Sequence, residues 1–202
     1  MIPESKLPAV TKALQAAFAV NNYDDISELT AGLSSALIFK IVVKGKPYLL
    51  RVITRTDEIS NPAFYFTCMK EAAAAGLAPQ IWYMSIEDRI CITDFITAKP
   101  FDISHARVIL PAEIKQLHSL PPFAERFNYI DRMYSFARQF REKNLLPANM
   151  TDELFHYYER IFSVYPRTPE DMVACHNDLK PENIIFDGNK AWLVDWEAAI
   201  ME

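Results

Sequence analysis

The sequence predicts an α+β fold in which a strand-rich first half is followed by a helical second half. The chain has 202 residues and is 50% hydrophobic, which is enough to bury a core in one domain or in two small lobes. Short β-rich runs dominate as far as residue 95, helical periodicity begins at Phe101, and a polar motif near the end precedes an apparent hairpin. These observations indicate a sheet, a helical region and a hairpin that carries polar side chains.

Five strands are predicted in the first half, and together they would form an antiparallel sheet. They cover residues 26–30, 37–43, 48–53, 81–84 and 89–95. Turn-forming segments at 31–35 and 44–47 separate the first three strands. A helix is predicted over 62–75, and Gly76 would end it.

The second half is predicted to be mostly helical. The expected helices cover residues 103–119, 129–144 and 152–163. Pro111 is expected to break the first of them, and Thr151 is expected to cap the last. The boundary between the halves should fall within 96–100, which divides the chain into a lobe of residues 1–97 and a lobe of residues 98–202.

Composition excludes several kinds of partner. The net charge of −5 and the pI near 5.4 argue against a nucleic-acid or anionic membrane surface, because such partners need clustered Lys and Arg. No apolar run is long enough for a membrane span. The apolar run 13–20 predicts an amphipathic helix beside the sheet, since Glu4 argues against a signal peptide. Cys68, Cys91 and Cys175 indicate buried thiols in a reducing cytoplasm.

The chemistry is predicted by the run His176–Asn183, with Asp195 following twelve residues later. Asp178 would accept or orient the proton of an attacking hydroxyl, and Lys180 would place its ammonium near a transferred phosphate. Asn183 and Asp195 offer the hard oxygen ligands that Mg²⁺ prefers. This set of residues is what phosphoryl transfer requires, because the reaction depends on positioning and charge stabilisation around a metal-bound nucleotide.

The local context supports the motif. Residues 183–186, the turn 187–189 and residues 191–195 predict a β-hairpin, which would bring Asn183 and Asp195 side by side. His176 is expected to pack and hydrogen-bond beneath the loop. The alternative is that these residues fell at such intervals by chance on an ordinary loop, and the strand–turn–strand context favours the motif.

The pattern His-Asn-Asp-x-x-Pro-x-Asn, followed by Asp195-Trp196-Glu197, resembles the choline kinase and aminoglycoside phosphotransferase group of small-molecule kinases. The likeness is close over 173–199 and looser back to residue 26. It implies a two-lobed protein-kinase-like fold, with an antiparallel five-stranded N-terminal lobe, a mostly helical C-terminal lobe and ATP in the cleft. Family members continue for several more helices, so the resemblance implies a truncated C-terminal lobe. Asn177 replaces the Arg with which protein kinases read a phosphorylated activation loop, which favours a metabolic kinase.

The resemblance also implies nucleotide contacts. Ser34 and Ser35 lie in the turn where a kinase covers the phosphates, although an ordinary hairpin turn is the alternative. Arg51 stands where protein kinases carry the third-strand Lys, and it would contact an ATP phosphate or else extend along the surface to solvent. Asp94 and Ile96 match the hinge whose backbone holds adenine, and a simple strand end is the alternative.

One departure concerns the helix over 62–75. Kinases place a Glu in the middle of this helix to pair with the third-strand cation, but the chain has Phe64-Tyr65-Phe66 there. Glu71 or Glu58 could substitute, or Arg51 could pair only with nucleotide.

The resemblance implies an ATP-dependent enzyme that phosphorylates the hydroxyl of a small-molecule acceptor. An amino alcohol such as choline or ethanolamine is the favoured acceptor, with aminoglycosides as a second class and a catalytically silent nucleotide- or protein-binding module as a third reading. Trp196 and Glu197 would suit an ammonium group, since a carboxylate beside an aromatic face attracts cations. Alternatively, Trp196 packs in the second lobe and Glu197 supports the metal site. The sequence leaves the oligomeric state open.

Overall fold

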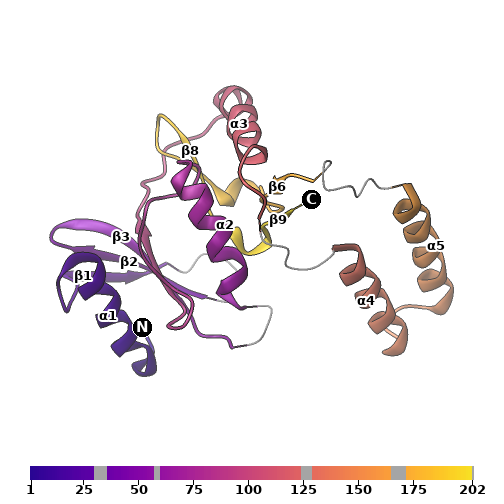
Figure 1. Ribbon diagram of the computed structural model, residues 1–202, viewed down its shortest axis with the longest axis horizontal. Helices are drawn as coiled ribbons and strands as arrows, with labels where there is room; N and C mark the ends of the chain where they lie inside the picture. Colours follow the sequence, from indigo (N-terminus) through magenta and orange to yellow (C-terminus); the bar gives the residue numbers. More distant parts are fainter. Residues whose placement is uncertain (30–35, 57–59, 124–128, 165–171, 202) are drawn as a thin grey trace.

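A computed structural model describes residues 1–29, 36–56, 60–123, 129–164 and 172–201, with side chains left out for 129–132. Figure 1 shows a sheet with helices on both of its faces, a helix and short strands packed beside it, and a separate pair of helices. The two lobes of the predicted fold are therefore present. Within the described residues, no helix is long and apolar enough to cross a membrane.

The N-terminal lobe is built on a five-stranded antiparallel sheet, as the strand pattern predicts. Its strands are β1 (Asp25–Glu28), β2 (Ala36–Val43), β3 (Lys46–Ile53), β4 (Ile81–Ser85) and β5 (Ile90–Asp94). They lie in the order β1-β2-β3-β5-β4. On β3, Leu50 faces one side of the sheet and Arg51 the other, where the register pairs Arg51 with Ile38 and Cys91.

Helix α1 (Leu7–Phe18) covers one face of this sheet. It buries Val10, Ala13 and Leu14, whose spacing places them on one side of the helix. They pack in a core with Phe39 and Leu50 of the sheet. The helix expected over 13–20 is thus present, but it begins earlier and ends at Phe18.

Helix α2 (Pro62–Ala74) packs near the other face of the sheet and confirms the expected helix there. Asn61 caps its start by accepting a hydrogen bond from the Ala63 N–H at 3.0 Å. Gly76 follows its end with φ +74°, the left-handed conformation that glycine adopts most readily.

The C-terminal lobe completes the end of α2. The last carbonyl groups of a helix lack intrahelical partners and carry partial negative charge. In α2, carbonyls of the last turn accept from the amides of Ala75, Gly76 and Leu77. The three carbonyls that follow the helix accept hydrogen bonds from three groups of the other lobe. These are Gln116 Nε2 to Ala75 O (2.7 Å), Lys190 Nζ to Gly76 O, and Leu193 N–H to Leu77 O (2.8 Å). The two lobes are therefore joined at this helix end.

Helix α3 (Ile103–His118) begins at Asp102, which accepts hydrogen bonds from two amides of the first turn. The expectation that Pro111 breaks this helix is wrong, because the helix continues through it. Pro111 and Arg107 are both exposed, so the carbonyl of Arg107 that loses its amide partner can be hydrated.

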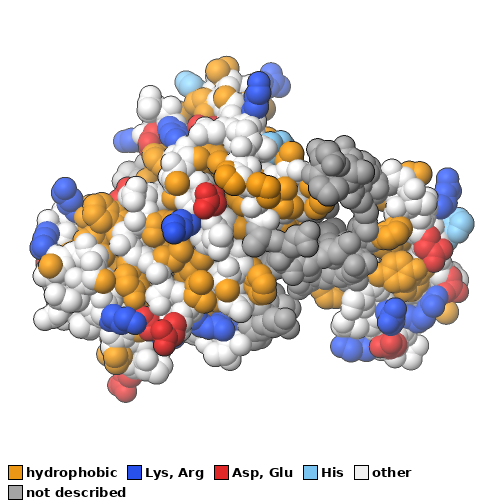
Figure 2. All heavy atoms as spheres, in the orientation of Figure 1, with side chains coloured by type: hydrophobic (Ala, Val, Ile, Leu, Met, Phe, Trp, Pro, Cys, Tyr) orange, Lys and Arg blue, Asp and Glu red, His pale blue; other side chains and the backbone are white. Residues whose placement is uncertain are grey.

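Helices α4 (Tyr129–Glu142) and α5 (Ala148–Val164) form an antiparallel pair. The Tyr134 and Phe155 rings pack 5.0 Å apart. The expected start of α5 is wrong, because the helix begins three residues before Thr151. Thr151 is buried and donates its hydroxyl hydrogen bond to the Pro147 carbonyl at 3.0 Å, so it does not cap the helix. Figure 2 shows apolar side chains gathered on this pair. Phe140 of α4 is one of the large apolar side chains that lie exposed.

Short elements close the chain around the polar motif. They are β6 (Ala174–Cys175), β7 (Ile184–Phe186), β8 (Ala191–Leu193) and β9 (Ile200–Met201), with single 3₁₀ turns η3 (Pro181–Asn183) and η4 (Trp196–Ala198). Strands β7 and β8 pair as the predicted hairpin. β6 pairs with β9, so both ends of the polar segment are tied together.

Replacing Lys190 tests the junction between the lobes. Lys190→Met should lower the free energy of unfolding by about 1–2 kcal/mol, because a helix-end carbonyl loses a charged donor while the aliphatic stem remains. Denaturant unfolding measures this change. Lys115→Met, at an exposed position of α3, is the matched control and should change stability little. Equal stability of the two variants would contradict the role of Lys190.

Candidate active site

His176 supports the motif loop from below. It is 1% exposed and packs against the Trp196 ring at 4.6 Å. Its Nε2 lies 2.9 Å from the Val194 carbonyl, and its Nδ1 lies 3.3 Å from the Asp178 N–H. The ring therefore accepts at Nδ1 and donates at Nε2, which is the neutral tautomer. Burial lowers the pKa of His176 and favours the same state. The expected packing role is confirmed.

Two residues of the site adopt left-handed backbone conformations. Asn177 has φ +60° and Asp195 has φ +65°. This region is costly for most residues, and Asn and Asp tolerate it best after glycine. The conformations turn the chain sharply just before Asp178 and at the end of the hairpin. They also give a local reason for Asn at position 177.

Asp178, Lys180 and Asn183 form one hydrogen-bonded group. Lys180 Nζ lies 3.0 Å from Asp178 Oδ2, and this contact raises the pKa of Lys180. Asn183 Nδ2 donates to the same Oδ2 and to the Asp178 backbone carbonyl, both at 2.8 Å. Asn183 is 5% exposed, so its amide is fixed by these two bonds. One oxygen of Asp178 is therefore held by two donors.

The hairpin sets the position of Asp195 relative to this group. The Val194 N–H donates to the Asn183 carbonyl at 3.0 Å, immediately beyond the paired residues of β7 and β8. Asn183 and Asp195 thus flank the same end of the hairpin. Within the described part of the chain, no three His, Cys, Asp or Glu side chains gather as a metal cluster.

Arg51 reaches this end of the hairpin from β3. Its side chain is 14% exposed. Nη1 lies 3.5 Å from Asp195 Oδ1, and Nη2 is paired with Glu197. Burial opposes the charge, but Tyr65, Glu197 and Asp195 together raise the pKa of Arg51. The expectation that Arg51 could pair only with nucleotide is therefore wrong, because carboxylates of the protein neutralise a cation that would otherwise be buried alone.

The other predicted nucleotide contacts are less defined. Ser34, Ser35 and Glu58 lie outside the described residues. Asp94 ends β5, and its side chain accepts a hydrogen bond from Trp82 Nε1 at 2.7 Å. Ile96 lies in the segment between β5 and α3. The adenine contact assigned to Asp94 and Ile96 stays a prediction.

Trp196 is not a substrate-facing aromatic. It is 1% exposed, and its Nε1 donates to the Leu193 carbonyl at 3.1 Å. The interpretation of Trp196 as a face for an ammonium group is wrong, and the alternative of packing in the C-terminal lobe is correct. The sequence did not predict that Tyr65 and Glu197 both contact Arg51. Tyr65 stands where the expected helix Glu is missing, and that substitution is the signal that could have pointed to it.

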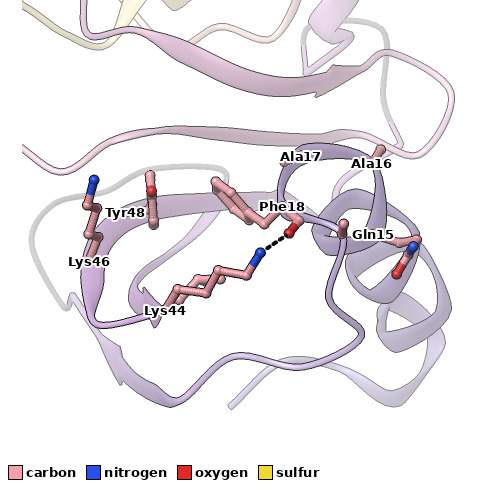
Figure 3. A pocket seen from close by; sticks show the side chains of 9 residues that line it. Gln15, Ala16, Ala17, Phe18, Lys44, Lys46 and Tyr48 are labelled. Atoms are coloured by element: carbon pink, nitrogen blue, oxygen red, sulfur yellow. Dashed lines mark hydrogen bonds between the residues drawn. The ribbon is translucent and has the colours of Figure 1, made fainter.

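A pocket of about 410 Å³ lies elsewhere, between the end of α1 and the β2–β3 turn. Figure 3 shows Lys44 donating to the Phe18 carbonyl there, with Tyr48 alongside. Tyr48 faces α1 and Arg51 faces away from it, so the sheet separates this pocket from the motif loop.

The sheet, the motif loop and the closing hairpin together define a protein-kinase-like fold. The chain belongs to the phosphotransferase enzyme family, whose sequence profile matches residues 25–201. No curated protein sequence matches the chain.

Solved structures share the fold. A choline/ethanolamine kinase family protein from Mesorhizobium loti is 21% identical, with a TM-score of 0.66 over 97% of this chain and 66% of that chain. Choline kinase LicA from Streptococcus pneumoniae is 17% identical, with a TM-score of 0.71 over 96% and 69%. APH(2″)-IIa, solved as a ternary complex with streptomycin and ATP, is 16% identical, with a TM-score of 0.70 over 100% and 72%. The chain thus spans about two thirds of the length of these proteins.

Substitutions at Asn177 test the left-handed turn. Asn177→Val should lower the free energy of unfolding by about 1–2 kcal/mol, because a β-branched side chain clashes with the backbone at positive φ. Asn177→Gly adopts the same backbone without strain and should cost much less. Urea unfolding compares the two variants. A valine variant as stable as the glycine variant would show that the turn is not strained.

Proposed function

We propose that the protein is an ATP-dependent phosphotransferase that transfers the γ-phosphate to the hydroxyl of a small molecule. The observation that carries the proposal is the hydrogen-bonded group of Asp178, Lys180 and Asn183, placed beside Asp195 and Arg51. Membership of the phosphotransferase family supports the reaction class, and the ATP complex of one structural neighbour supports the choice of nucleotide.

Asp178 is proposed to orient the acceptor hydroxyl. The contacts to Asn183 and Lys180 both use Oδ2, so the carboxylate is held in one direction before an acceptor arrives. A fixed acceptor for the hydroxyl proton brings the attacking oxygen into line and lowers the barrier. The ammonium of Lys180, held close to this carboxylate, is proposed to meet the negative charge of the transferred phosphate.

Asn183 and Asp195 fit a Mg²⁺ ion. The amide nitrogen of Asn183 donates towards Asp178, which leaves its oxygen available as a hard ligand. The Asp195 carboxylate is one-third exposed and supplies the second protein oxygen. When bound, Mg²⁺ would neutralise charge on the β- and γ-phosphates. Two protein oxygens and several waters are a common shell for Mg²⁺ in nucleotide sites.

The nucleotide contacts are proposed from the fold. Arg51 would place its guanidinium against a phosphate while it stays paired with the carboxylates beside it. Ser34 and Ser35 are proposed for the phosphates as well, and the backbone of Asp94 and Ile96 for adenine. Lys180 and the metal ligands would then both act on the γ-phosphate.

We propose an amino alcohol, such as choline or ethanolamine, as the acceptor. Structural neighbours named as choline or choline/ethanolamine kinases support this choice. An aminoglycoside is the second candidate, because another neighbour was solved with streptomycin. Both classes are cationic alcohols. A silent nucleotide-binding module would bind Mg·ATP and phosphorylate neither.

Replacing Asp178 tests the catalytic assignment. Asp178→Asn should lower turnover by roughly 10²–10⁴-fold, because the proton acceptor is lost, and should leave Mg·ATP affinity nearly unchanged. Steady-state kinetics and calorimetry measure the two effects. Glu182→Gln, an exposed change in the same loop, is the control for altered charge. Near-normal turnover of Asp178→Asn would sink the assignment.

Removing the Asp195 carboxylate tests the metal site. Asp195→Ala should abolish the Mg²⁺-dependent part of ATP binding, and Asn183→Ala should weaken it. Calorimetric titrations with and without Mg²⁺ separate this part from binding of the nucleotide alone. Asp195→Gly, which accepts positive φ without strain, should behave like Asp195→Ala. Unchanged Mg·ATP affinity in both variants would count decisively against the site.

A substrate panel tests the acceptor. The protein should phosphorylate choline or ethanolamine faster than a neutral sugar alcohol of similar size, and faster than aminoglycosides. Product formation followed by mass spectrometry gives the ranking. Faster turnover of aminoglycosides or neutral sugars would overturn the amino alcohol and leave the kinase reaction in place. Mg·ATP binding without any product would support the silent module.

A further inference from the structure

Arg51 is held by groups from both lobes, and these contacts are unequal. Tyr65 of α2 places its ring 5.7 Å from the guanidinium carbon. From the C-terminal lobe, Glu197 pairs directly with Nη2, whereas Asp195 Oδ1 lies 3.5 Å from Nη1. The closer carboxylate is thus the one that follows the proposed metal ligand by two residues.

The carboxylate of α2, on Glu71, does not belong to this group around Arg51. Glu71 lines a groove between α2 and β4 together with Thr67 and Lys70. Glu71 lies six positions after Tyr65, which places the two side chains on different faces of the helix. Glu58 lies outside the described residues. Among the described residues, α2 therefore meets Arg51 with an aromatic ring, and the carboxylates that contact Arg51 come from the C-terminal lobe.

The segment that carries Glu197 is firmly anchored. Trp196 is buried and bonded to the Leu193 carbonyl, and the Ala199 N–H donates to the Trp196 carbonyl at 3.0 Å. The Cys68 thiol of α2 lies 3.9 Å from the Ala199 carbonyl. A carboxylate on such a segment can fix the direction of a long side chain without a large loss of its own freedom.

We propose that Glu197 is a positioning residue that holds Arg51 away from Asp195 and so keeps Asp195 available for Mg²⁺. This inference rests on the proposed phosphotransferase function. A buried guanidinium needs a carboxylate, and two carboxylates of the described residues lie within reach of Arg51. If Glu197 is neutralised, the guanidinium moves closer to Asp195 and competes with the metal for the same oxygen. Glu197 then acts on the metal through Arg51, and Tyr65 packs the guanidinium from the side of α2.

The pairing can be measured without nucleotide. A double-mutant cycle of Arg51→Gln and Glu197→Gln on the unfolding equilibrium should give a coupling of at least tenfold in the unfolding constant, because each single change leaves a charge without its main partner. The pair Arg51→Gln and Glu182→Gln is the matched control and should be additive. Additive behaviour of Arg51 and Glu197 would overturn the pairing.

Metal binding separates positioning from direct ligation. Calorimetry should show that Glu197→Gln weakens the Mg²⁺-dependent part of ATP binding about tenfold, and that Glu197→Asp recovers part of it. In an Arg51→Gln background, Glu197→Gln should have no further effect on this part. A further loss there would mean that Glu197 ligates the metal itself, which would overturn the proposal.

A relocated carboxylate provides a second check. Adding Tyr65→Glu to Glu197→Gln puts a carboxylate on α2 beside Arg51 and should restore the Mg²⁺-dependent part of ATP binding. Tyr65→Phe in the same Glu197→Gln background should not restore it. Failure of Tyr65→Glu to restore it in a folded protein would count against the competition for Asp195. Different results would contradict the proposed function and the pairing of Arg51 with Glu197. Absence of Mg·ATP binding by the wild-type protein would contradict the phosphotransferase function. The double-mutant cycle on unfolding, which needs no nucleotide, would still test the pairing.

Discussion

The carbonyl groups at the end of α2 tie the two lobes together. The carbonyls of the three residues that follow the helix, 75–77, accept hydrogen bonds from α3 and from the closing hairpin. Because Leu193 belongs to β8 and bonds to Leu77, the strand that leads to Asp195 is fixed to the N-terminal lobe. The distance between Arg51 and the hairpin therefore depends on this junction as much as on the residues of the cleft.

The candidate site is held in place by contacts within the protein itself. Neutral His176 accepts from the loop and donates to the hairpin, so one buried ring fixes both segments. Left-handed turns at Asn177 and Asp195 aim the neighbouring side chains, and their conformational cost is offset by the packing around Trp196. Such preorganisation is what a reaction controlled by charge and position needs, since little is left to rearrange in the transition state.

Local sequence patterns predicted the strands and the end of α2, but they failed for two helix positions whose role depends on exposure to solvent or on burial. Short β-rich runs predicted all five strands, and Gly76 predicted the end of α2, because these features depend on residues close together in the chain. Pro111 was expected to break α3 and does not, since the lost hydrogen bond faces water. Thr151 was expected to cap α5, but its hydroxyl bonds back to Pro147, and the helix starts earlier.

The sequence alone predicted the motif from His176 to Asn183 and its hairpin, because residues close in the chain fix one another through short turns, and it pointed to the phosphoryl transfer proposed for the motif. It also indicated that Arg51 needs an anionic partner. Only the tertiary structure identified Glu197 and Asp195 as partners of Arg51. It also showed that Trp196 is buried against His176. Arg51 and Glu197 lie 146 positions apart, and a contact over such a separation leaves no local periodicity. It arises only when the lobes pack and a buried charge takes the nearest carboxylate.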